Sequence, residues 1–171
     1  MNTALIVTSS ANGENSVSNR LATELVERLR EAHPGLGITL RDVGADPLPH
    51  LTERTVRAIK DTPETVAELA ARALSDGLVR ELQQADLIVI ASPMYNFGMS
   101  STLKTWFDHV LRAGVTFRYT EAGPEGLLKG KKAVVIESRA GAYGEGPAAA
   151  MDGQEPHLRT LRRLPGEEHL V

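Results

Sequence analysis

The chain contains no cysteine, and that absence excludes three classes of site together. A disulfide framework, a zinc site with thiolate ligands and a cysteine nucleophile all depend on a sulfur that is missing here. Basic character is also weak, because 19 lysines and arginines are outnumbered by 22 aspartates and glutamates, for a net charge of −3. With no basic run to bind phosphodiesters, we expect no nucleic-acid partner.

Long hydrophobic runs are absent too. No window approaches the roughly 20 apolar residues that a membrane-spanning helix needs, and the N-terminus, Met1-Asn2-Thr3-Ala4, lacks the basic region of a secretory signal. We therefore expect no membrane partner and a cytoplasmic location. The length of 171 residues predicts one domain, residues 1–171, with room for a real core.

The motifs of several catalytic classes are missing. The sequence has no GxxxxGK[ST] loop, no GxGxxG turn and no GxSxG elbow, so a P-loop nucleotidase, a dinucleotide-binding Rossmann domain and an esterase are all disfavoured. The histidines show no metal-ligand spacing, and Asp108 fits a solvent-facing carboxylate. We therefore predict no catalytic side chain and expect a cofactor to carry the chemistry.

What is present is an alternation of strands and helices. Val- and Ile-rich runs predict strands at residues 4–8, 38–41, 87–91 and 133–137. Amphipathic patterns predict helices at residues 17–29, 66–82 and 103–111, the second with Thr62 as N-cap before Pro63, and a weaker helix begins near Pro147. This order predicts an α/β fold with a parallel sheet, in the order 2-1-3-4. Two long connections, residues 43–61 and 113–132, are candidates for functional loops.

Small hydroxyl residues follow the first predicted strand and lead into the first helix. The N-terminus of a helix attracts a phosphate through its free N–H groups, and Ser10, Ser16 and Ser18 offer additional O–H donors. The serines alone are equally consistent with a polar loop and a simple N-cap.

Two further loops follow the third and fourth strands. Residues 92–98, Ser-Pro-Met-Tyr-Asn-Phe-Gly, offer a flat aromatic and amide surface, and residues 138–147 contain three glycines and Arg139. We expect Arg139 to offset negative charge on a ligand ring, although in isolation this segment fits a flexible surface loop. Because the loops after strands one, three and four of such a sheet meet at one crevice, the three together form a matched set for FMN.

The chain also resembles a known family, the FMN-dependent NADH-azoreductases, a branch of the flavodoxin-like NAD(P)H:quinone reductases. The matching stretches are the serine-rich first loop and residues 92–97, 103–108, 113–121, 123–128 and 138–139. Together they cover roughly residues 3–150. The resemblance implies that Tyr119 lies near the substrate side of the flavin. The residues that it implies bind FMN are Ser10, Ser16, Val17, Ser18, Met94, Tyr95, Asn96, Phe97, Ser138, Arg139, Ala140 and Gly141.

Two departures from the family pattern stand out. Ala140 replaces the first glycine of Ser-Arg-Gly-Gly, and a left-handed backbone there would strain alanine by about 1 kcal/mol. After residue 150 the resemblance fades, and no Val/Ile-rich run follows Glu137 to form a fifth strand or precede a last helix. We expect the fourth strand to be an exposed edge, shielded by the tail or by a partner subunit.

These observations lead to one preferred function and two alternatives. The preferred one is an FMN-dependent oxidoreductase that moves hydride from NADH or NADPH to quinones and aromatic azo compounds by a ping-pong scheme, as a homodimer. The homodimer is implied by the resemblance and supported by the apolar, aromatic residues 115–119. The alternatives are a non-enzymatic flavodoxin-type electron carrier and a cofactor-free protein that only binds a partner.

Overall fold

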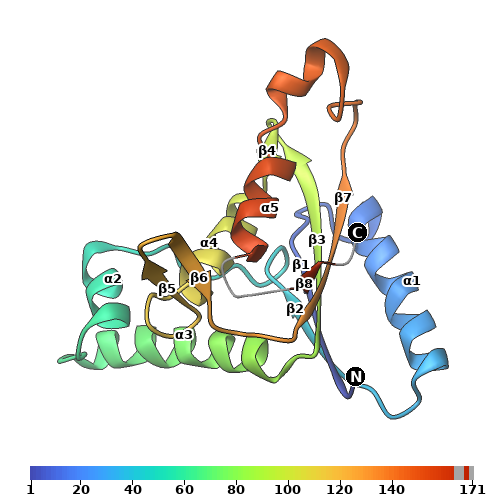
Figure 1. Ribbon diagram of the computed structural model, residues 1–171. Helices are drawn as coiled ribbons and strands as arrows, with labels where there is room; N and C mark the ends of the chain where they lie inside the picture. Colours follow the sequence, from blue (N-terminus) through green and yellow to red (C-terminus); the bar gives the residue numbers. More distant parts are fainter. Residues whose placement is uncertain (164–167, 170–171) are drawn as a thin grey trace.

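The computed structural model describes residues 1–163 and 168–169 of the chain. Its centre is a parallel sheet in the order β2-β1-β3-β7-β8 (Figure 1). The strands are β1 (Thr3–Thr8), β2 (Gly37–Asp42), β3 (Leu87–Tyr95), β7 (Lys132–Ser138) and β8 (Glu168–His169). The α/β class, the strands at the four predicted places and their order are confirmed.

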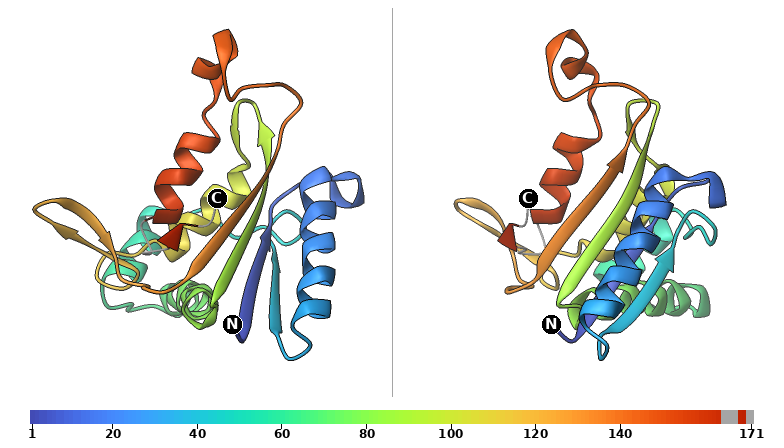
Figure 2. Two further views of the ribbon diagram at one scale, coloured as in Figure 1. Left: turned by 45° about the vertical axis from the view of Figure 1, so that its right-hand side comes forward. Right: turned by 90° about the vertical axis from the view of Figure 1, so that its right-hand side faces the viewer.

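Helices cover the two faces of the sheet unequally. Of the helices that the structure describes, α1 (Val17–Ala32) packs on one face (Figure 2). The other face carries α3 (Val66–Gln84), α4 (Ser101–Val110) and α5 (Glu155–Arg163), which share one core cluster with the strands. Alternate residues of β1 enter the two cores, Leu5 on the α3–α5 side and Ile6 on the α1 side, so the strands read as continuous apolar runs.

The third strand is longer than its apolar run. We predicted a loop from residue 92, but β3 continues to Tyr95 and turns back into β4 (Gly98–Met99), which pairs with it antiparallel. The two turn residues, Asn96 and Phe97, have φ angles of 48° and 69°. A two-residue hairpin turn of this kind needs positive φ at both central positions, which Asn adopts readily and Phe rarely does. The aromatic and amide groups therefore sit on a rigid hairpin.

The prediction that the fifth strand is missing was wrong. After α5, residues Glu168 and His169 pair with Lys132 and Ala133 as β8. A ladder of backbone hydrogen bonds needs no Val/Ile-rich run, which is why composition did not reveal so short a strand. The predicted shielding of the β7 edge by the tail is confirmed for Lys132 and Ala133.

Other boundaries also differ from the predictions. Residues near Pro147 form a short 3-10 helix, η2 (Gly146–Met151), and the α-helix follows it. The 43–61 connection contains an additional helix, α2 (Glu53–Lys60). Helix α3 is capped by Thr65 rather than Thr62, because Thr65 and Glu68 form a reciprocal capping box. None of the described helices combines the length and apolar character that crossing a membrane requires.

The Glu68 side chain, only 3% exposed, joins α2 to α3. Its carboxylate accepts hydrogen bonds from the N–H groups of Glu64 and Thr65, at 2.9 and 3.1 Å, and pairs with Arg57 at 3.1 Å. The hydrogen bond from the Glu64 N–H makes the largest contribution, and that from Arg57 the next, to lowering the pKa of Glu68 from 4.5 to about 2. The ionised form is therefore favoured in the folded state.

We expect Glu68→Gln to lower the melting temperature at neutral pH. A depressed folded-state pKa contributes stability above the unfolded value and loses it as the pH falls toward 2, so the deficit should shrink in acid. Thermal melts followed by circular dichroism between about pH 7 and pH 3 measure this. Glu24→Gln, in an exposed pair with Arg20, is the control with little expected effect. A deficit that stays constant with pH would contradict the assignment.

Candidate functional site

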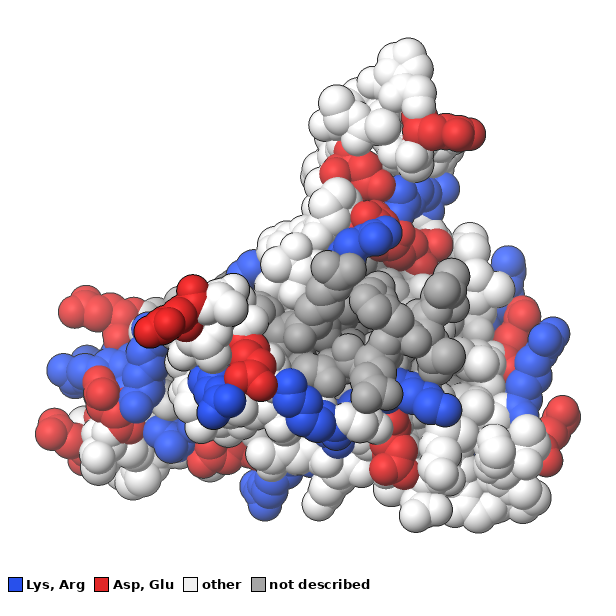
Figure 3. Space-filling model, in the orientation of Figure 1, with Lys and Arg blue, Asp and Glu red and all other residues white. Residues whose placement is uncertain are grey.

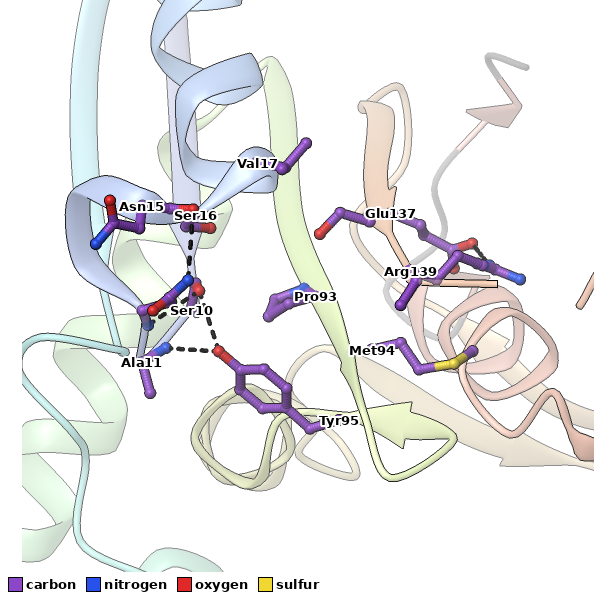
Figure 4. A pocket seen from close by; sticks show the side chains of 13 residues that line it. Ser10, Ala11, Asn15, Ser16, Val17, Pro93, Met94, Tyr95, Glu137 and Arg139 are labelled. Atoms are coloured by element: carbon purple, nitrogen blue, oxygen red, sulfur yellow. Dashed lines mark hydrogen bonds and ion pairs between the residues drawn. The ribbon is translucent and has the colours of Figure 1, made fainter. Parts of the chain in front are cut away.

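A cleft of about 780 Å³ opens at the carboxyl ends of β1, β3 and β7. Three segments line it: the loop after β1 with the start of α1, the end of β3, and the end of β7 with the loop that follows. The predicted convergence of these three loops is therefore confirmed. The lining residues are Ser10, Ala11, Asn12, Asn15, Ser16, Val17, Pro93, Met94, Tyr95, Glu137, Ser138, Arg139 and Ala140 (Figure 4).

One end of the cleft is the N-terminus of α1. Ser16 is the N-cap residue, and its Oγ accepts from the Asn19 N–H at 3.2 Å. The N–H groups of the next two residues, Val17 and Ser18, belong to the first turn and have no intrahelical acceptor. None of the described residues that line this end carries a carboxylate, so free N–H groups, hydroxyls and the helix dipole together favour an anion. Ser16 is thus a helix cap, as the simpler interpretation of the serines held, and it also faces the cleft.

Tyr95 connects β3 to this anion-binding end. Its phenol oxygen lies 3.1 Å from Ser10 Oγ and accepts from the Ala11 N–H at 3.1 Å. Ser10 Oγ in turn accepts from the Asn12 N–H at 3.2 Å. Figure 4 shows the Tyr95 ring reaching from β3 toward the loop after β1. Tyr95 was predicted as part of a flat surface and as an FMN-binding residue, and its hydrogen bonds to the loop after β1 are an addition that the tertiary structure makes.

Ser18 does not line the cleft. Its side chain is fully buried behind Ser16, with the two Oγ atoms 3.2 Å apart. The predicted O–H donation from Ser18 to a ligand is therefore not supported by its position. The group of Ser18 that remains at the helix end is its backbone N–H.

Gly44, which follows β2, packs directly against the backbone of the loop after β1. A Cβ on this residue would lie 2.3 Å from the carbonyl oxygen of Ser10. The Asp42 carboxylate holds the turn by accepting from the Gly44 N–H at 2.9 Å. The sequence shows only a glycine in a long connection, which did not identify this close approach.

The opposite end of the cleft meets the β3–β4 hairpin. A second cavity of about 220 Å³ shares Met94 and Ala140 with the main cleft and adds Asn96, Phe97 and Tyr143. The rings of Phe97 and Tyr143 meet edge to face, with centroids 5.9 Å apart. Asn96 and Phe97 are therefore adjacent to the main cleft rather than inside it.

The loop after β7 differs from the expectation in two ways. Ala140 does not have a left-handed φ, so its substitution for glycine carries no backbone strain. Gly141 lies under Tyr143, where a Cβ would approach the ring to 3.1 Å. The absence of a side chain at Gly141 therefore serves aromatic packing.

Arg139 is not a free cation. Its guanidinium pairs with Glu137 and, at 2.6 Å, with Asp152, so the group of three carries one net negative charge when both carboxylates are ionised. Burial raises the pKa of Glu137, and Arg139 offsets only part of that effect. Burial opposes ionisation of Asp152 as well, but the N–H groups of residues 155 and 154, together with Arg139, outweigh it and lower the pKa of Asp152. Arg139 therefore has two carboxylate partners within the chain, and its expected role of offsetting negative charge on a ligand ring stays a prediction.

Tyr119 lies away from this cleft. It belongs to the hairpin of β5 (Phe117–Thr120) and β6 (Gly123–Gly126), is 76% exposed, and borders a different cavity of about 590 Å³ beside α2, α3 and α4. Within one chain, the structure does not bring Tyr119 to the residues predicted to bind FMN.

Comparisons with known proteins agree with the fold and the site. A family described as having a flavodoxin-like fold matches residues 2–170, so the resemblance extends beyond the predicted limit at residue 150. An FMN-dependent NADH:quinone oxidoreductase of Hyphomonas neptunium is 56% identical over 161 residues, 94% of this chain and 77% of the relative. An FMN-dependent NADH:quinone oxidoreductase of Escherichia coli O157:H7 is 49% identical over 94% of this chain and 80% of its own length.

Solved structures lead to the same family. The azoreductase of Bacillus anthracis str. Sterne superposes with a TM-score of 0.88 at 29% identity, over 99% of this chain and 84% of the other. An FMN-dependent NADH-azoreductase of Bacillus anthracis str. Ames Ancestor, solved in complex with FMN, gives 0.88 at 25% identity over 98% and 84%. The chain therefore belongs to the flavodoxin-like family that includes the FMN-dependent NADH:quinone oxidoreductases and azoreductases.

Proposed function

We propose that the protein is an FMN-dependent oxidoreductase that uses NADH or NADPH to reduce quinones and aromatic azo compounds. The observation that carries the proposal is the cleft itself, where an anion-binding helix end and an aromatic hairpin meet at the carboxyl edge of the sheet. Relatives with about half of their residues identical are named as FMN-dependent NADH:quinone oxidoreductases.

The residues present fit FMN. Ser10 and Ser16 offer hydroxyls beside the free N–H groups of α1, which suits a phosphomonoester, and the cleft volume lies within the range of cofactor sites. Met94 offers a thioether and Tyr95 an aromatic ring to the ring system, and Asn96 lies in the adjoining cavity with an amide for the polar edge of the ring.

The chemistry that FMN supplies when bound is two-electron transfer, taking a hydride from NAD(P)H and delivering it to a quinone or azo acceptor. The residues of the chain bind and orient. Ser16 and the α1 N-terminus hold the phosphate, while Tyr95 fixes the loop after β1 to β3, so that the two ends of the cleft keep their separation. We assign no side chain as a catalytic acid or base.

We further propose that the protein is a cytoplasmic homodimer. Tyr119 is 76% exposed on a hairpin outside the strand–helix alternation, and exposed aromatic groups of this kind are enriched at interfaces. Charge supports a small-molecule acceptor over a carrier's protein partner, because electron carriers are usually strongly acidic at the flavin rim. Here the net charge of the whole chain is only −3, and acidic and basic side chains are interspersed on the face that Figure 3 shows.

The test is turnover by the purified protein. Supplied with FMN, it should oxidise NADH when 1,4-benzoquinone is the only acceptor, and double-reciprocal plots at several quinone concentrations should be parallel. Intersecting lines would exclude the ping-pong scheme. FMN binding without turnover would favour the electron carrier, and failure to bind FMN would favour the partner-binding alternative. Light scattering on the same sample should give a dimer, and a fully active monomer would contradict the proposed interface.

A further inference from the structure

Three consecutive residues, 152–154, lie between η2 and α5. They contact three segments around the end of the cleft that adjoins the β3–β4 hairpin, which we call the ring end. Each uses a different group, and each reaches a different segment: the loop after β7, the tip of the β3–β4 hairpin, and β3 itself. In Figure 1 the start of α5 lies close to this hairpin. The contacts are Asp152 to Arg139 at 2.6 Å, the Gly153 N–H to the Phe97 carbonyl at 2.8 Å, and Gln154 Nε2 to the Ser92 carbonyl at 2.9 Å.

Gln154 fixes the start of α5 to β3. Its side chain is fully buried, and the same Nε2 also lies 3.1 Å from Ser92 Oγ. The other amide atom, Oε1, is buried and has no hydrogen-bond partner among the described residues. The two contacts of Nε2 with Ser92 set the orientation of this amide, although that orientation leaves the buried acceptor Oε1 unpaired at a cost in free energy.

Gly153 supports the strained hairpin tip. Phe97 has a φ of 69°, a conformation that a bulky residue holds only where its surroundings impose it. The Gly153 N–H bonds the Phe97 carbonyl, and a Cβ on Gly153 would lie 3.0 Å from that oxygen. The backbones of residues 153 and 97 therefore lie so close together that a side chain at residue 153 would crowd the Phe97 carbonyl.

Asp152 has two separate roles on its two oxygens. Oδ1 accepts from the N–H groups of Gln154 and Glu155, at 2.9 and 3.1 Å, and so holds the turn that leads into α5. Oδ2 holds Arg139. The base for these contacts is rigid, because Leu158 of α5 is 1% exposed in the core shared with α3 and α4.

We propose that residues 152–154 are a positioning segment, through which the docking of α5 sets the geometry of the ring end of the cleft. Asp152 positions the loop after β7 through Arg139, and Gly153 and Gln154 position the hairpin and β3. This inference rests on the proposed FMN function. It adds that affinity for the ring system depends on residues that do not line the cleft.

The test compares Asp152→Asn and Gln154→Leu with the unmodified protein. The side-chain oxygen of asparagine can accept the same two N–H bonds, so Asp152→Asn keeps the turn into α5 but removes the ion pair with Arg139. Fluorescence titration with FMN and with riboflavin, which has no phosphate, should show both dissociation constants rising by the same factor, about tenfold. Because folding lowers the pKa of Asp152, the ligand-free Asp152→Asn protein should melt at a moderately lower temperature, and the titrations are made well below that temperature, where the protein is fully folded. Asp61→Asn, an exposed aspartate at the end of α2, is the charge-matched control.

The outcomes of these titrations distinguish the positioning segment from the proposed function. Equal loss for the two ligands supports the positioning segment, because the effect lies at the ring and not at the phosphate. Loss for FMN alone, or unchanged affinities in both variants, overturns it. A fall in affinity that tracks a large fall in melting temperature also overturns it, since general destabilisation then suffices. If the unmodified protein binds neither ligand, the proposed function itself fails.

Discussion

A Ser16→Asp variant is expected to keep its melting temperature and to lose its affinity for FMN. Aspartate ranks with serine as an N-cap, and its charge interacts favourably with the helix dipole, so α1 should remain intact. The same charge would face the phosphate across the anion-binding end of the cleft. We expect the dissociation constant for FMN to rise at least about a hundredfold, which corresponds to about 2.7 kcal/mol.

Two comparisons make this result specific. Riboflavin lacks the phosphate, so its affinity should change far less than that of FMN in the Ser16→Asp protein. Ser16→Ala should instead cost about 1 kcal/mol of stability through the lost cap, with a smaller loss of FMN affinity. If FMN binds the Ser16→Asp protein as tightly as the unmodified protein, the phosphate does not lie at the start of α1.

A Gly44→Ala variant is expected to lose both stability and FMN binding, although residue 44 does not line the cleft. The new Cβ would lie 2.3 Å from the Ser10 carbonyl oxygen and 2.7 Å from its carbonyl carbon. Backbone cannot rotate away as a side chain can, so the loop after β1 must shift. Overpacking of this kind costs about 1–3 kcal/mol, and the shift would move Ser10 away from Tyr95.

The matched control is Gly35→Ala. A Cβ on Gly35 would meet no atom within 4 Å beyond its immediate chain neighbours, and the residue has no left-handed φ, so alanine there should be tolerated. Thermal melting and FMN titration of the two variants separate a general effect of losing glycine from the contact with Ser10. Normal FMN affinity in Gly44→Ala would mean that this loop adjusts without affecting the site.

Much of the fold follows from local pattern. The apolar run at residues 87–91 is buried on both faces, and buried parallel strands have that composition wherever they occur. The Thr65–Glu68 capping box is also visible in the sequence as Thr-x-x-Glu. Thr62 was predicted as the N-cap because proline follows it, but the reciprocal hydrogen bonds of Thr65 and Glu68 fix the start of α3. The strand β8 had no such signal, because pairing at an edge depends on where the chain passes and not on which side chains it carries.

The candidate site likewise combines features that the sequence predicted with contacts that it did not. Its three loops were predicted because the carboxyl ends of parallel strands meet whatever the details of packing. The partners of Arg139 were not, since Asp152 is 13 residues away and reaches Arg139 only through the path of η2 and the start of α5. Gly44 and Ser10 likewise lie on different loops, and their contact exists only once β2 pairs with β1.

The sequence by itself therefore determined the class of fold, the loops that form the cleft and the resemblance to FMN-dependent reductases, because each depends on residues close together in the chain or on strand order. Only the tertiary structure decided that Ser18 is buried behind Ser16, that Arg139 is neutralised by two carboxylates, and that residues 152–154 hold the hairpin. Those features depend on burial and on contacts that the path of the chain makes possible, such as that of Asp152 with Arg139, 13 residues apart, and they leave no periodic pattern in the sequence.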